Sequence, residues 1–326
     1  MRAVILAGGK GTRLRPLTDT RPKPLLPFAG DPFAAGLLRR LGAVGCTHAT
    51  FLVGQEGTPF APLRALGAAL GIAVDVVTEP QPLDTAGAAR DLLAGSHDGP
   101  FVVCNGDILT DLDYGDLLAA HRAAGATATL ALTRVEDTSA FGVVDVDADG
   151  RVRRFVEKPA PGTLAADTVN AGTYVLDASA FDFSPPEGPL SFERAVFPGL
   201  LDRGAVVLGV VSDAFWMDLG TPDRYLRGHR AVLTGRCDWP QGEGFDRDGS
   251  VLVHRDARVA GDATLTDCVC VGPRALIAAG ATVSGSAIFE DAVVGEGARL
   301  TDSIVGEGAQ IPAGADVSGA VVPPKG

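Results

Sequence analysis

Lysine is scarce in this chain, and positive charge of any kind is in the minority. Of 326 residues, 28 are Lys or Arg and 40 are Asp or Glu, so the formal net charge is −12. A chain of this sign does not bind nucleic acid or an anionic membrane through a basic surface. The lysines are Lys10, Lys23, Lys158 and Lys325. A phosphate-bearing ligand must therefore meet a local cluster of cations, and we expect neither nucleic acid nor a membrane as a partner.

Long hydrophobic runs and closely paired cysteines are also missing. No run approaches the roughly 18 apolar residues of a membrane-spanning helix, and the apolar run after Arg2 is too short for a signal peptide. The 5 cysteines include no C-x-x-C pair, so we expect reduced thiols and a cytoplasmic protein. Cys268 and Cys270 suit either small buried positions or a metal clip, and we favour the first.

Two common phosphate-binding motifs are absent as well. The sequence contains neither the G-x-x-x-x-G-K-[ST] of P-loop ATPases nor the G-x-G-x-x-G of dinucleotide-binding domains. A phosphate site in this chain must therefore be built from a different glycine-rich turn.

Such a turn lies within residues 1–30. The apolar run at residues 2–7 predicts a buried strand, and the glycine-rich segment GGKGTR follows at residues 8–13. Glycines let the backbone approach a ligand closely, and successive N–H groups form a concavity that binds anions. Lys23 then stands between two prolines, which hold it rigidly. A strand, a nest of amides and fixed cations together predict a site for a polyphosphate.

Strands and helices alternate in the region that follows. Short apolar runs at residues 50–53, 72–78 and 101–106 predict strands, with helical stretches between them. This alternation favours a parallel sheet with helices on both faces, in which ligands bind at the carboxyl ends of the strands. Asp107 directly follows one such end, where a carboxylate would face the cleft.

Two helix starts have recognisable signals. Asp31 and Pro32 have the residue types of a helix cap and first turn, so we expect a helix to begin there. Asp113 is expected to cap a helix that starts at Tyr114 and that Gly125 ends.

The composition changes near residue 237, and a six-residue rhythm begins at residue 250. An apolar residue recurs in each step, two of the steps are shorter, and a small residue usually stands two positions earlier. The recurring apolar positions are Val253, Val259, Leu265, Val271, Ile277, Val283, Phe289, Val294, Leu300, Val305, Ile311 and Val317. This is the hexapeptide pattern of a left-handed parallel β-helix. We therefore expect an α/β domain at residues 1–236, a linker at 237–249 and a β-helix at 250–326, through which the chain self-associates.

Three segments carry a resemblance to a known family. They are A-G-G-x-G-T-R-L-x-P-L-T with a following P-K-P, F-V-E-K-P at residues 155–159, and F-W-M-D-L-G-x-P at residues 215–222. They resemble the signatures of sugar-1-phosphate nucleotidyltransferases, and the resemblance extends over essentially the whole chain. It implies a Rossmann-like catalytic domain with a mostly parallel sheet, then the β-helix. It also implies a reaction in which an NTP and a sugar 1-phosphate form an NDP-sugar and pyrophosphate.

The resemblance also implies roles for individual residues. Contacts with the nucleotide are expected from Leu6, Ala7, Gly8, Gly9, Gly11, Thr12 and Gly87. Arg13 and Lys23 would neutralise charge on the phosphates. Asp107 and Asp218 would hold Mg²⁺, which prefers few carboxylates together with phosphate oxygens and water. The incoming sugar phosphate would be held by Gly142, Glu157, Lys158 and Asn170.

The base and the sugar have several candidates. F-V-E-K-P, N-A-G-x-Y and F-W-M-D-L-G-x-P look most like mannose-1-phosphate guanylyltransferases, which implies GTP and mannose 1-phosphate. The opening segment equally resembles uridylyl- and thymidylyltransferases that use glucose 1-phosphate, and a manno-heptose phosphate is a further alternative. Asp84 stands where the family usually has glycine, just before Thr85-Ala86-Gly87, which leaves the shape of that loop and the base preference open.

Two other classes of protein share parts of this pattern. Hexapeptide β-helices occur in acyltransferases, which need a catalytic histidine, and the candidate here is His254. A non-catalytic paralogue that senses sugar nucleotides would share the fold but would not need Lys23, Asp107, Lys158 and Asp218. Serine, cysteine and histidine are absent from the motifs, which fits direct in-line attack without an enzyme nucleophile.

Overall fold

The computed structural model describes residues 1–54, 60–79, 81–93, 99–160 and 166–325. Contacts between residues divide the chain into two compact units. The first unit comprises Met1–Gly9, Leu38–Ile108 and Leu112–Trp216, and the second comprises Lys10–Leu37, Leu109–Asp111 and Met217–Gly326. The chain therefore passes from the first unit to the second inside the glycine-rich turn, directly after Gly9.

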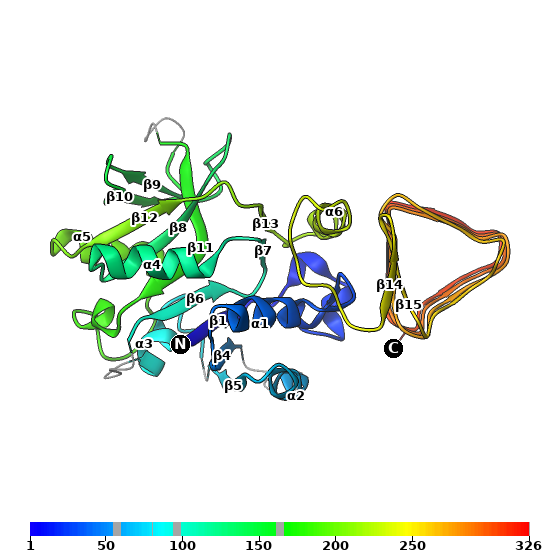
Figure 1. Cartoon of the computed structure of the whole chain (residues 1–326), viewed down its shortest axis with the longest axis horizontal. Helices are drawn as coiled ribbons and strands as arrows, with labels where there is room; N and C mark the ends of the chain where they lie inside the picture. Colours follow the sequence, from blue (N-terminus) through cyan, green and yellow to red (C-terminus); the bar gives the residue numbers. More distant parts are fainter. Residues whose placement is uncertain (55–59, 80, 94–98, 161–165, 326) are drawn as a thin grey trace. The chain divides into compact units, whose positions relative to one another are not determined.

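A mixed sheet with a parallel half forms the centre of the first unit (Figure 1). The parallel strands lie in the order β6 (Phe101–Asn105), β1 (Arg2–Ala7), β4 (His48–Val53) and β5 (Ala73–Thr78). The side chains of β1, β4 and β6 are mostly buried and apolar, as expected of strands covered on both faces, whereas the edge strand β5 is mostly exposed. Gly8 and Asp107 follow the carboxyl ends of the neighbouring strands β1 and β6, so the expected α/β arrangement is confirmed.

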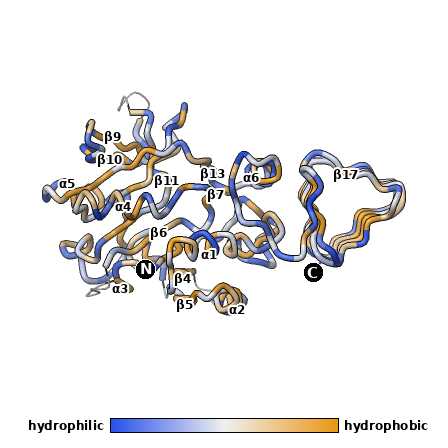
Figure 2. Tube along the Cα trace, viewed as in Figure 1, coloured by the Kyte–Doolittle hydropathy of each residue, from blue (hydrophilic) through white to orange (hydrophobic). Residues whose placement is uncertain are grey.

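The other half of this sheet is built on one long antiparallel strand, β11 (Thr168–Leu176). β11 pairs with β6 on one side and with β8 (Ala128–Arg134) and β9 (Gly142–Val146) on the other. β9 forms a hairpin with β10 (Val152–Glu157), and β12 (Val207–Val211) runs parallel to β8. Figure 2 shows hydrophobic residues along the strands of this sheet, where the core of the unit lies.

Capping side chains, Asp113 and Thr221, precede two of the helices. The helices are α1 (Phe33–Ala43), α2 (Pro62–Ala69), α3 (Gly87–Leu93), α4 (Tyr114–Ala124), α5 (Phe197–Asp202) and α6 (Pro222–Leu233). Asp113 accepts hydrogen bonds from two backbone N–H groups of α4, and Gly125 ends that helix at a φ of 56°, which confirms both signals. In the part of the chain that the structure describes, no helix has the length and apolar character to cross a membrane.

The expected start of α1 is wrong. Asp31 and Pro32 form a two-residue strand, β3, which pairs with β2 (Pro27–Phe28), and the helix begins at Phe33. Phe28 packs edge-on against Phe33 with ring centroids 5.5 Å apart. The backbone of Asp31 and Pro32 pairs with Phe28 and Pro27 in this hairpin, so the helix cannot begin before Phe33.

The second unit contains a parallel β-helix, which confirms the hexapeptide interpretation (Figure 1). Its first face stacks β15 (Val251–His254), β18 (Cys270–Val271), β21 (Ala287–Ile288), β24 (Ile304–Val305) and β27 (Val321–Val322), with β14 (Phe245–Asp248) antiparallel at the edge. The second face stacks β16 (Arg258–Val259), β19 (Leu276–Ile277), β22 (Val293–Val294) and β25 (Gln310–Ile311). The third stacks β17 (Thr264–Thr266), β20 (Thr282–Ser284), β23 (Arg299–Thr301) and β26 (Asp316–Ser318).

One inner position of the β-helix differs from the expected rhythm. Val271 pairs with Ile288, and Ile288 pairs with Val305, so Ile288 rather than Phe289 points into the coil. The first short step therefore lies between Val283 and Ile288, one repeat earlier than the step from Phe289 to Val294 that the sequence pattern suggested. A β-strand alternates its side chains, so this shift turns Phe289 outward. Its ring lies near Tyr225 of α6, with centroids 6.4 Å apart.

The β-helix core offers a matched pair of substitutions in one strand. Ile277 is fully buried inside the coil, whereas its neighbour Leu276 is 39% exposed. We expect Ile277→Ala to lower the free energy of unfolding by about 2–5 kcal/mol, because it removes stacked contacts and leaves a cavity. Leu276→Ala, which deletes the same number of carbons, should change it by about 0.5 kcal/mol or less. Urea unfolding measures both, and equal losses would contradict the assigned inner face.

Candidate functional site

Asp218 is the centre of a charged cluster within the second unit. Its carboxylate lies 3.0 Å from Arg224 Nη1, 3.6 Å from Lys23 Nζ and 3.8 Å from Arg13 Nη2. We call these four residues the Asp218 cluster. The structure thus brings together three predicted residues from two distant motifs. One carboxylate facing three cations leaves a net positive site that suits a polyphosphate.

Lys23 and Arg13 are held by two short 3₁₀ turns. Lys23 opens η3 (Lys23–Leu25), and its side chain is only 12% exposed because Leu25 and Leu26 anchor the turn in the core. Arg13 lies in η1 (Thr12–Leu14), whose Leu14 is fully buried. The pyrrolidine rings on either side of Lys23 restrict the backbone, so the ammonium is positioned with little freedom to lose.

Gly11 shapes the turn that carries Thr12 and Arg13. Its φ is 61°, a left-handed conformation, and Thr18 donates a hydrogen bond from its hydroxyl to the Gly11 carbonyl. A Cβ added at Gly11 would come within 3.0 Å of Thr18 Cγ2. Glycine is therefore required here by both backbone conformation and space.

Asp218 ends strand β13 (Trp216–Asp218), and Gly220 keeps the adjoining space clear. A Cβ at Gly220 would lie 2.7 Å from Arg13 Nη2 and 3.0 Å from the Asp218 carboxylate oxygens. Thr221 then caps α6 by accepting a hydrogen bond from the Arg224 N–H. Asp218 Oδ1 is buried and, among the described residues, accepts no hydrogen bond. The Lys23 ammonium lies 3.6 Å from this oxygen, beyond hydrogen-bond distance, so the oxygen keeps capacity to accept a hydrogen bond or to bind a cation.

Arg224 is a member of this cluster that the sequence analysis missed. It lies in the first turn of α6, and its guanidinium donates a hydrogen bond to Asp218 Oδ2. The only local signal was its place three residues after the cap Thr221, which does not tell where the side chain points. Its contact with Asp218 depends on the path of the chain between β13 and α6.

The first half of the glycine-rich turn belongs to the first unit. Leu6 and Ala7 end β1, and the Leu6 carbonyl accepts a hydrogen bond from the Gly106 N–H on the neighbouring strand. A Cβ at Gly9 would meet nothing within 4 Å among the described residues, and one at Gly8 would make ordinary contacts with Gly54 N at 3.7 Å and Glu79 Oε1 at 3.8 Å. The glycines thus leave open backbone that a ligand can approach.

Asp107 lies between β6 and β7 (Ile108–Thr110), next to this turn. Gly106, which precedes it, donates to Leu6 across the sheet, and a Cβ there would lie 3.1 Å from the Leu6 carbonyl oxygen. The close pairing of the two strand ends therefore fixes the backbone position from which the Asp107 side chain extends. Its half-buried carboxylate follows the carboxyl end of a central strand, as predicted.

The Asp84 loop keeps the shape that glycine would give it. Asp84 has a φ of 60°, its carboxylate accepts from the Thr85 N–H, and its other oxygen lies 2.5 Å from Arg194 Nη2. The ion pair and the local hydrogen bond offset the strain of a left-handed aspartate. Gly87 begins α3 in a tight place, because a Cβ there would lie 2.8 Å from Leu83 Cβ.

The residues expected to hold the sugar phosphate lie together at adjacent strand ends. Gly142 pairs with Glu157 in the β9–β10 hairpin, and Val143 beside it pairs with Val169, the neighbour of Asn170. A Cβ at Gly142 would lie 2.8 Å from Glu157 Oε2, so this carboxylate lies over the glycine. Lys158, with a φ of 45°, places its ammonium 3.7 Å from Glu157 Oε1.

Asn170 is oriented by its neighbours along β11. Its side chain donates to the Tyr174 hydroxyl at 2.8 Å and accepts from the Gly172 N–H at 3.0 Å. The pairing of β11 with β8 is irregular between Asn170 and Tyr174, which re-aims this side chain. A carboxylate, an ammonium and an amide in one place form a set suited to the hydroxyls and phosphate of a sugar phosphate.

Glu193 is a second residue that the sequence analysis missed. It accepts hydrogen bonds from the hydroxyls of Thr85 and Ser191, at 2.7 Å and 2.9 Å. Burial raises the pKa of Glu157, and the negative charge of Glu193 raises it further. Glu193 thus connects the Thr85 loop electrostatically to the sugar-phosphate residues. It lies in a π-helical turn, a conformation that often marks functional sites but has no clear sequence signal.

Asp107 and Asp218, each within its own unit, have the side-chain chemistry of a magnesium ligand. Within the described ranges, no group of three or more His, Cys, Asp or Glu side chains could hold a metal. The unsatisfied Asp218 Oδ1 and the half-buried Asp107 each offer carboxylate oxygen, the ligand type that Mg²⁺ prefers. Cys268 and Cys270 are buried free thiols, consistent with the small-residue interpretation.

The Asp218 cluster predicts how phosphate affinity responds to its central charge. Asp218→Asn removes the anion that compensates Arg13, Lys23 and Arg224. We expect this variant to bind inorganic pyrophosphate about tenfold more tightly without divalent metal, a change of about 1.4 kcal/mol. Isothermal titration calorimetry at two salt concentrations measures this gain, which should shrink at high salt.

Asp223→Asn is the matched control for that experiment. Asp223 is 76% exposed and pairs with Arg227 on the surface of α6. Its substitution should leave pyrophosphate affinity unchanged. An unchanged affinity in Asp218→Asn as well would contradict the compensating role of Asp218.

Comparison with known proteins identifies the family to which the chain belongs. Residues 2–235 match the family model described as Nucleotidyl transferase, and residues 247–325 match the one described as GMPPB C-terminal domain. A mannose-1-phosphate guanylyltransferase of Mycobacterium tuberculosis is 40% identical over 290 residues, which cover 88% of this chain and 79% of that protein. A probable mannose-1-phosphate guanylyltransferase of Oryza sativa is 34% identical over 303 residues, covering 90% and 82%.

A solved structure is similar over the first part of the chain. HddC from Yersinia pseudotuberculosis, complexed with GMP-PN, has a TM-score of 0.58 and 28% identity, covering 70% of this chain and 97% of that one. The family models together span most of the sequence and coincide with the α/β and β-helix regions. As its motifs predict, this chain belongs to the nucleotidyl transferase family, as a sugar-1-phosphate nucleotidyltransferase with a C-terminal domain of the GMPPB type.

Proposed function

We propose that this protein transfers the guanylyl group of GTP to mannose 1-phosphate, forming GDP-mannose and releasing pyrophosphate. The observation that carries the proposal is the 34–40% identity to mannose-1-phosphate guanylyltransferases over 88–90% of this chain. The Asp218 cluster and the sugar-phosphate residues support it, because they supply the two kinds of binding groups that such a reaction needs.

The leaving pyrophosphate is bound by the glycine-rich turn and the cations that follow it. N–H groups of Gly8, Gly9, Gly11 and Thr12 donate hydrogen bonds to phosphate oxygens. Lys23 and Arg13 stabilise the negative charge that develops on the departing group. Their stabilisation is strongest in the transition state, where the bond to the α-phosphorus is breaking, and this difference accelerates the reaction.

The sugar phosphate is the nucleophile, so the protein contributes position rather than a covalent intermediate. Lys158 binds the phosphate of the incoming sugar, while Glu157 and Asn170 accept from and donate to its hydroxyls. Holding the attacking oxygen in line with the leaving group converts an encounter of two substrates into an oriented reaction.

Asp107 and Asp218 are the residues that would hold Mg²⁺. A magnesium ion held there would supply positive charge that offsets the negative charge of the substrate phosphates. Before substrate binds, Asp218 also has a structural role: its carboxylate offsets the positive charges of Lys23, Arg13 and Arg224. Binding of a polyphosphate supplies that compensation instead and frees carboxylate oxygen for other partners.

The Asp84 loop and Gly87 are proposed to contact the guanine base. The left-handed φ of Asp84 supports this, since glycine, the residue usual in the family, adopts that conformation readily. Self-association through the β-helix and a cytoplasmic location stay predictions of the sequence.

The substrate proposal is tested by pyrophosphate release across a matrix of substrates. The matrix combines five nucleoside triphosphates with the 1-phosphates of mannose, glucose and glucosamine. We expect GTP with mannose 1-phosphate to give a kcat/KM at least about tenfold above any other pair, a difference of about 1.4 kcal/mol in transition-state binding. Highest turnover with glucose 1-phosphate and UTP or dTTP would replace the assigned substrates, and no turnover in any combination would refute the enzyme.

The catalytic roles are tested by Lys23→Ala and Asp107→Ala. We expect each to lower kcat by about 100-fold or more with little change in stability, because each removes charge that acts on the transition state. Asp116→Ala, which removes an exposed carboxylate in the first turn of α4, is the control and should retain normal turnover. Thermal unfolding confirms that the variants are folded, and near-normal turnover in Asp107→Ala would refute the metal assignment.

A further inference from the structure

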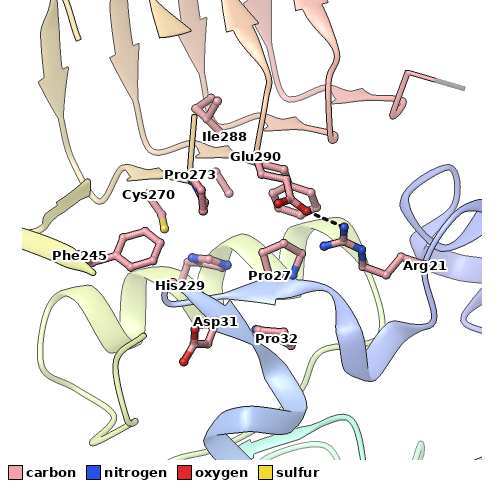
Figure 3. A pocket seen from close by; sticks show the side chains of 14 residues that line it. Arg21, Pro27, Asp31, Pro32, His229, Phe245, Cys270, Pro273, Ile288 and Glu290 are labelled. Atoms are coloured by element: carbon pink, nitrogen blue, oxygen red, sulfur yellow. Dashed lines mark hydrogen bonds and ion pairs between the residues drawn. The ribbon is translucent and has the colours of Figure 1, made fainter. Parts of the chain in front are cut away.

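A cavity of about 220 Å³ lies in the second unit, beneath the first face of the β-helix (Figure 3). On one side it is lined by His229 of α6 and by Pro27 and Pro32 of the β2–β3 hairpin. On the other side lie Cys270 and Ile288 of the coil. The volume is far above the roughly 30 Å³ share of one water molecule. It is slightly below the roughly 300 Å³ at which pockets for drug-sized ligands begin, which suits a single ring.

His229 is a buried polar side chain in the wall of this cavity without a protein partner. It is 3% exposed, and among the described residues neither ring nitrogen makes a hydrogen bond. Phe28 and Tyr225 pack against its ring at centroid distances of 4.4 Å and 4.9 Å, which fixes the ring in place. Burying such a group without a partner is unfavourable, so its retention points to a ligand that supplies the hydrogen bonds.

The imidazole presents one donor and one acceptor. Burial lowers the pKa of His229 to about 4, so the ring is neutral near pH 7. The Pro27 carbonyl favours the protonated ring and opposes this shift, but it does not reach hydrogen-bond geometry with either nitrogen. A neutral imidazole can bond a hydroxyl group, which also donates and accepts.

The charges around the cavity argue against an anionic occupant. Arg21 is the cation among the described lining residues, and it already pairs with Glu290 at 2.7 Å and Glu307 at 2.5 Å. Asp31 and Glu290 add two carboxylates to the lining. A phosphate or nucleotide would meet net negative charge in this lining, whereas a neutral ring would find apolar walls.

Two covalent paths lead from this cavity to the Asp218 cluster. Arg21 is separated from Lys23 only by Pro22, which transmits the position of one to the other with little flexibility. His229 lies on α6, whose first turn carries Arg224. A ligand that shifts either the Arg21 segment or α6 therefore changes how the three cations face Asp218.

We propose that this cavity is an effector site for one neutral, hydroxyl-bearing ring of about the size of a hexose, and that its occupancy modulates the Asp218 cluster. Phe289, turned outward by the early short step of the β-helix, and Phe245 provide apolar faces for the ring. His229 provides the central hydrogen bonds. The effect on turnover rests on the proposed function, but binding itself does not.

Binding is tested on the full chain with D-mannose, D-glucose and myo-inositol by saturation-transfer NMR. We expect at least one of them to bind with a dissociation constant on the order of 1 mM, as expected for a small ligand of few atoms. His229→Phe should weaken binding about tenfold or more, because it removes both ring nitrogens but keeps a ring of similar shape. Its thermal stability without ligand should equal or exceed that of the parent, since no satisfied hydrogen bond is lost.

A second variant and a control separate this site from the catalytic one. Ala287→Leu places a larger side chain in the cavity wall and should also weaken binding. Glu157→Ala removes a proposed sugar contact of the catalytic site and should leave effector binding intact. Binding lost in Glu157→Ala but kept in His229→Phe and Ala287→Leu would overturn the proposal. So would no binding by any of the three rings, or a lower stability of His229→Phe that shows ordered water on the imidazole.

The coupling to the Asp218 cluster is read from kinetics and from binding. The ring that binds should change the KM for GTP at least about twofold in the parent and not in His229→Phe. If the parent has no turnover, the same shift is measured as a change in pyrophosphate affinity by calorimetry. Equal pyrophosphate affinity with and without the ring would refute the coupling. The proposed function is tested separately, by the substrate matrix.

Discussion

Charge compensation at Asp218 is the interaction on which the second unit's functional surface depends. Arg13, Lys23 and Arg224 come from separate elements, and without an anion they would repel one another. A single carboxylate at the end of β13 holds them in place before any substrate binds. The cluster keeps a net positive charge after folding, because one carboxylate cannot neutralise three cations. A polyphosphate completes it, so the same imbalance serves both stability and binding.

Helix α6 connects the Asp218 cluster to His229. Its first turn carries Arg224, which donates a hydrogen bond to Asp218, and its C-terminal half carries His229. Neither ring nitrogen of His229 has a hydrogen-bond partner among the described residues, and natural proteins rarely leave such atoms unsatisfied. The prolines around Lys23 and the aromatic packing of Phe28 and His229 make the connecting structure stiff. In a stiff structure a small displacement at one position reaches the other instead of being absorbed.

Local sequence signals identified most of the site because the chemistry needs special backbone. Gly11 occupies a left-handed turn, and Gly142 makes room for the Glu157 carboxylate. Asp107 follows an apolar run that the sequence marks as a buried strand. Arg224 and Glu193 could not be found in this way. Each acts through a contact with a residue from another segment, and no local pattern encodes the direction of an exposed helical or π-turn side chain. The early short step at Ile288 was missed because Ile288 and Phe289 are both apolar, and only pairing with Val271 and Val305 separates them.

The sequence by itself determined the fold class, the β-helix, the family and the residue types of the site, since all of these follow from periodicity, glycine placement and short motifs. Tertiary structure alone decided which charges meet. It brought Arg224 to Asp218, gave Asp84 the conformation of a glycine, started α1 at Phe33 rather than at Asp31, and left His229 in a cavity without a partner. The physical reason is that periodicity records which side of an element is buried, whereas contact between distant side chains depends on packing that no single segment contains.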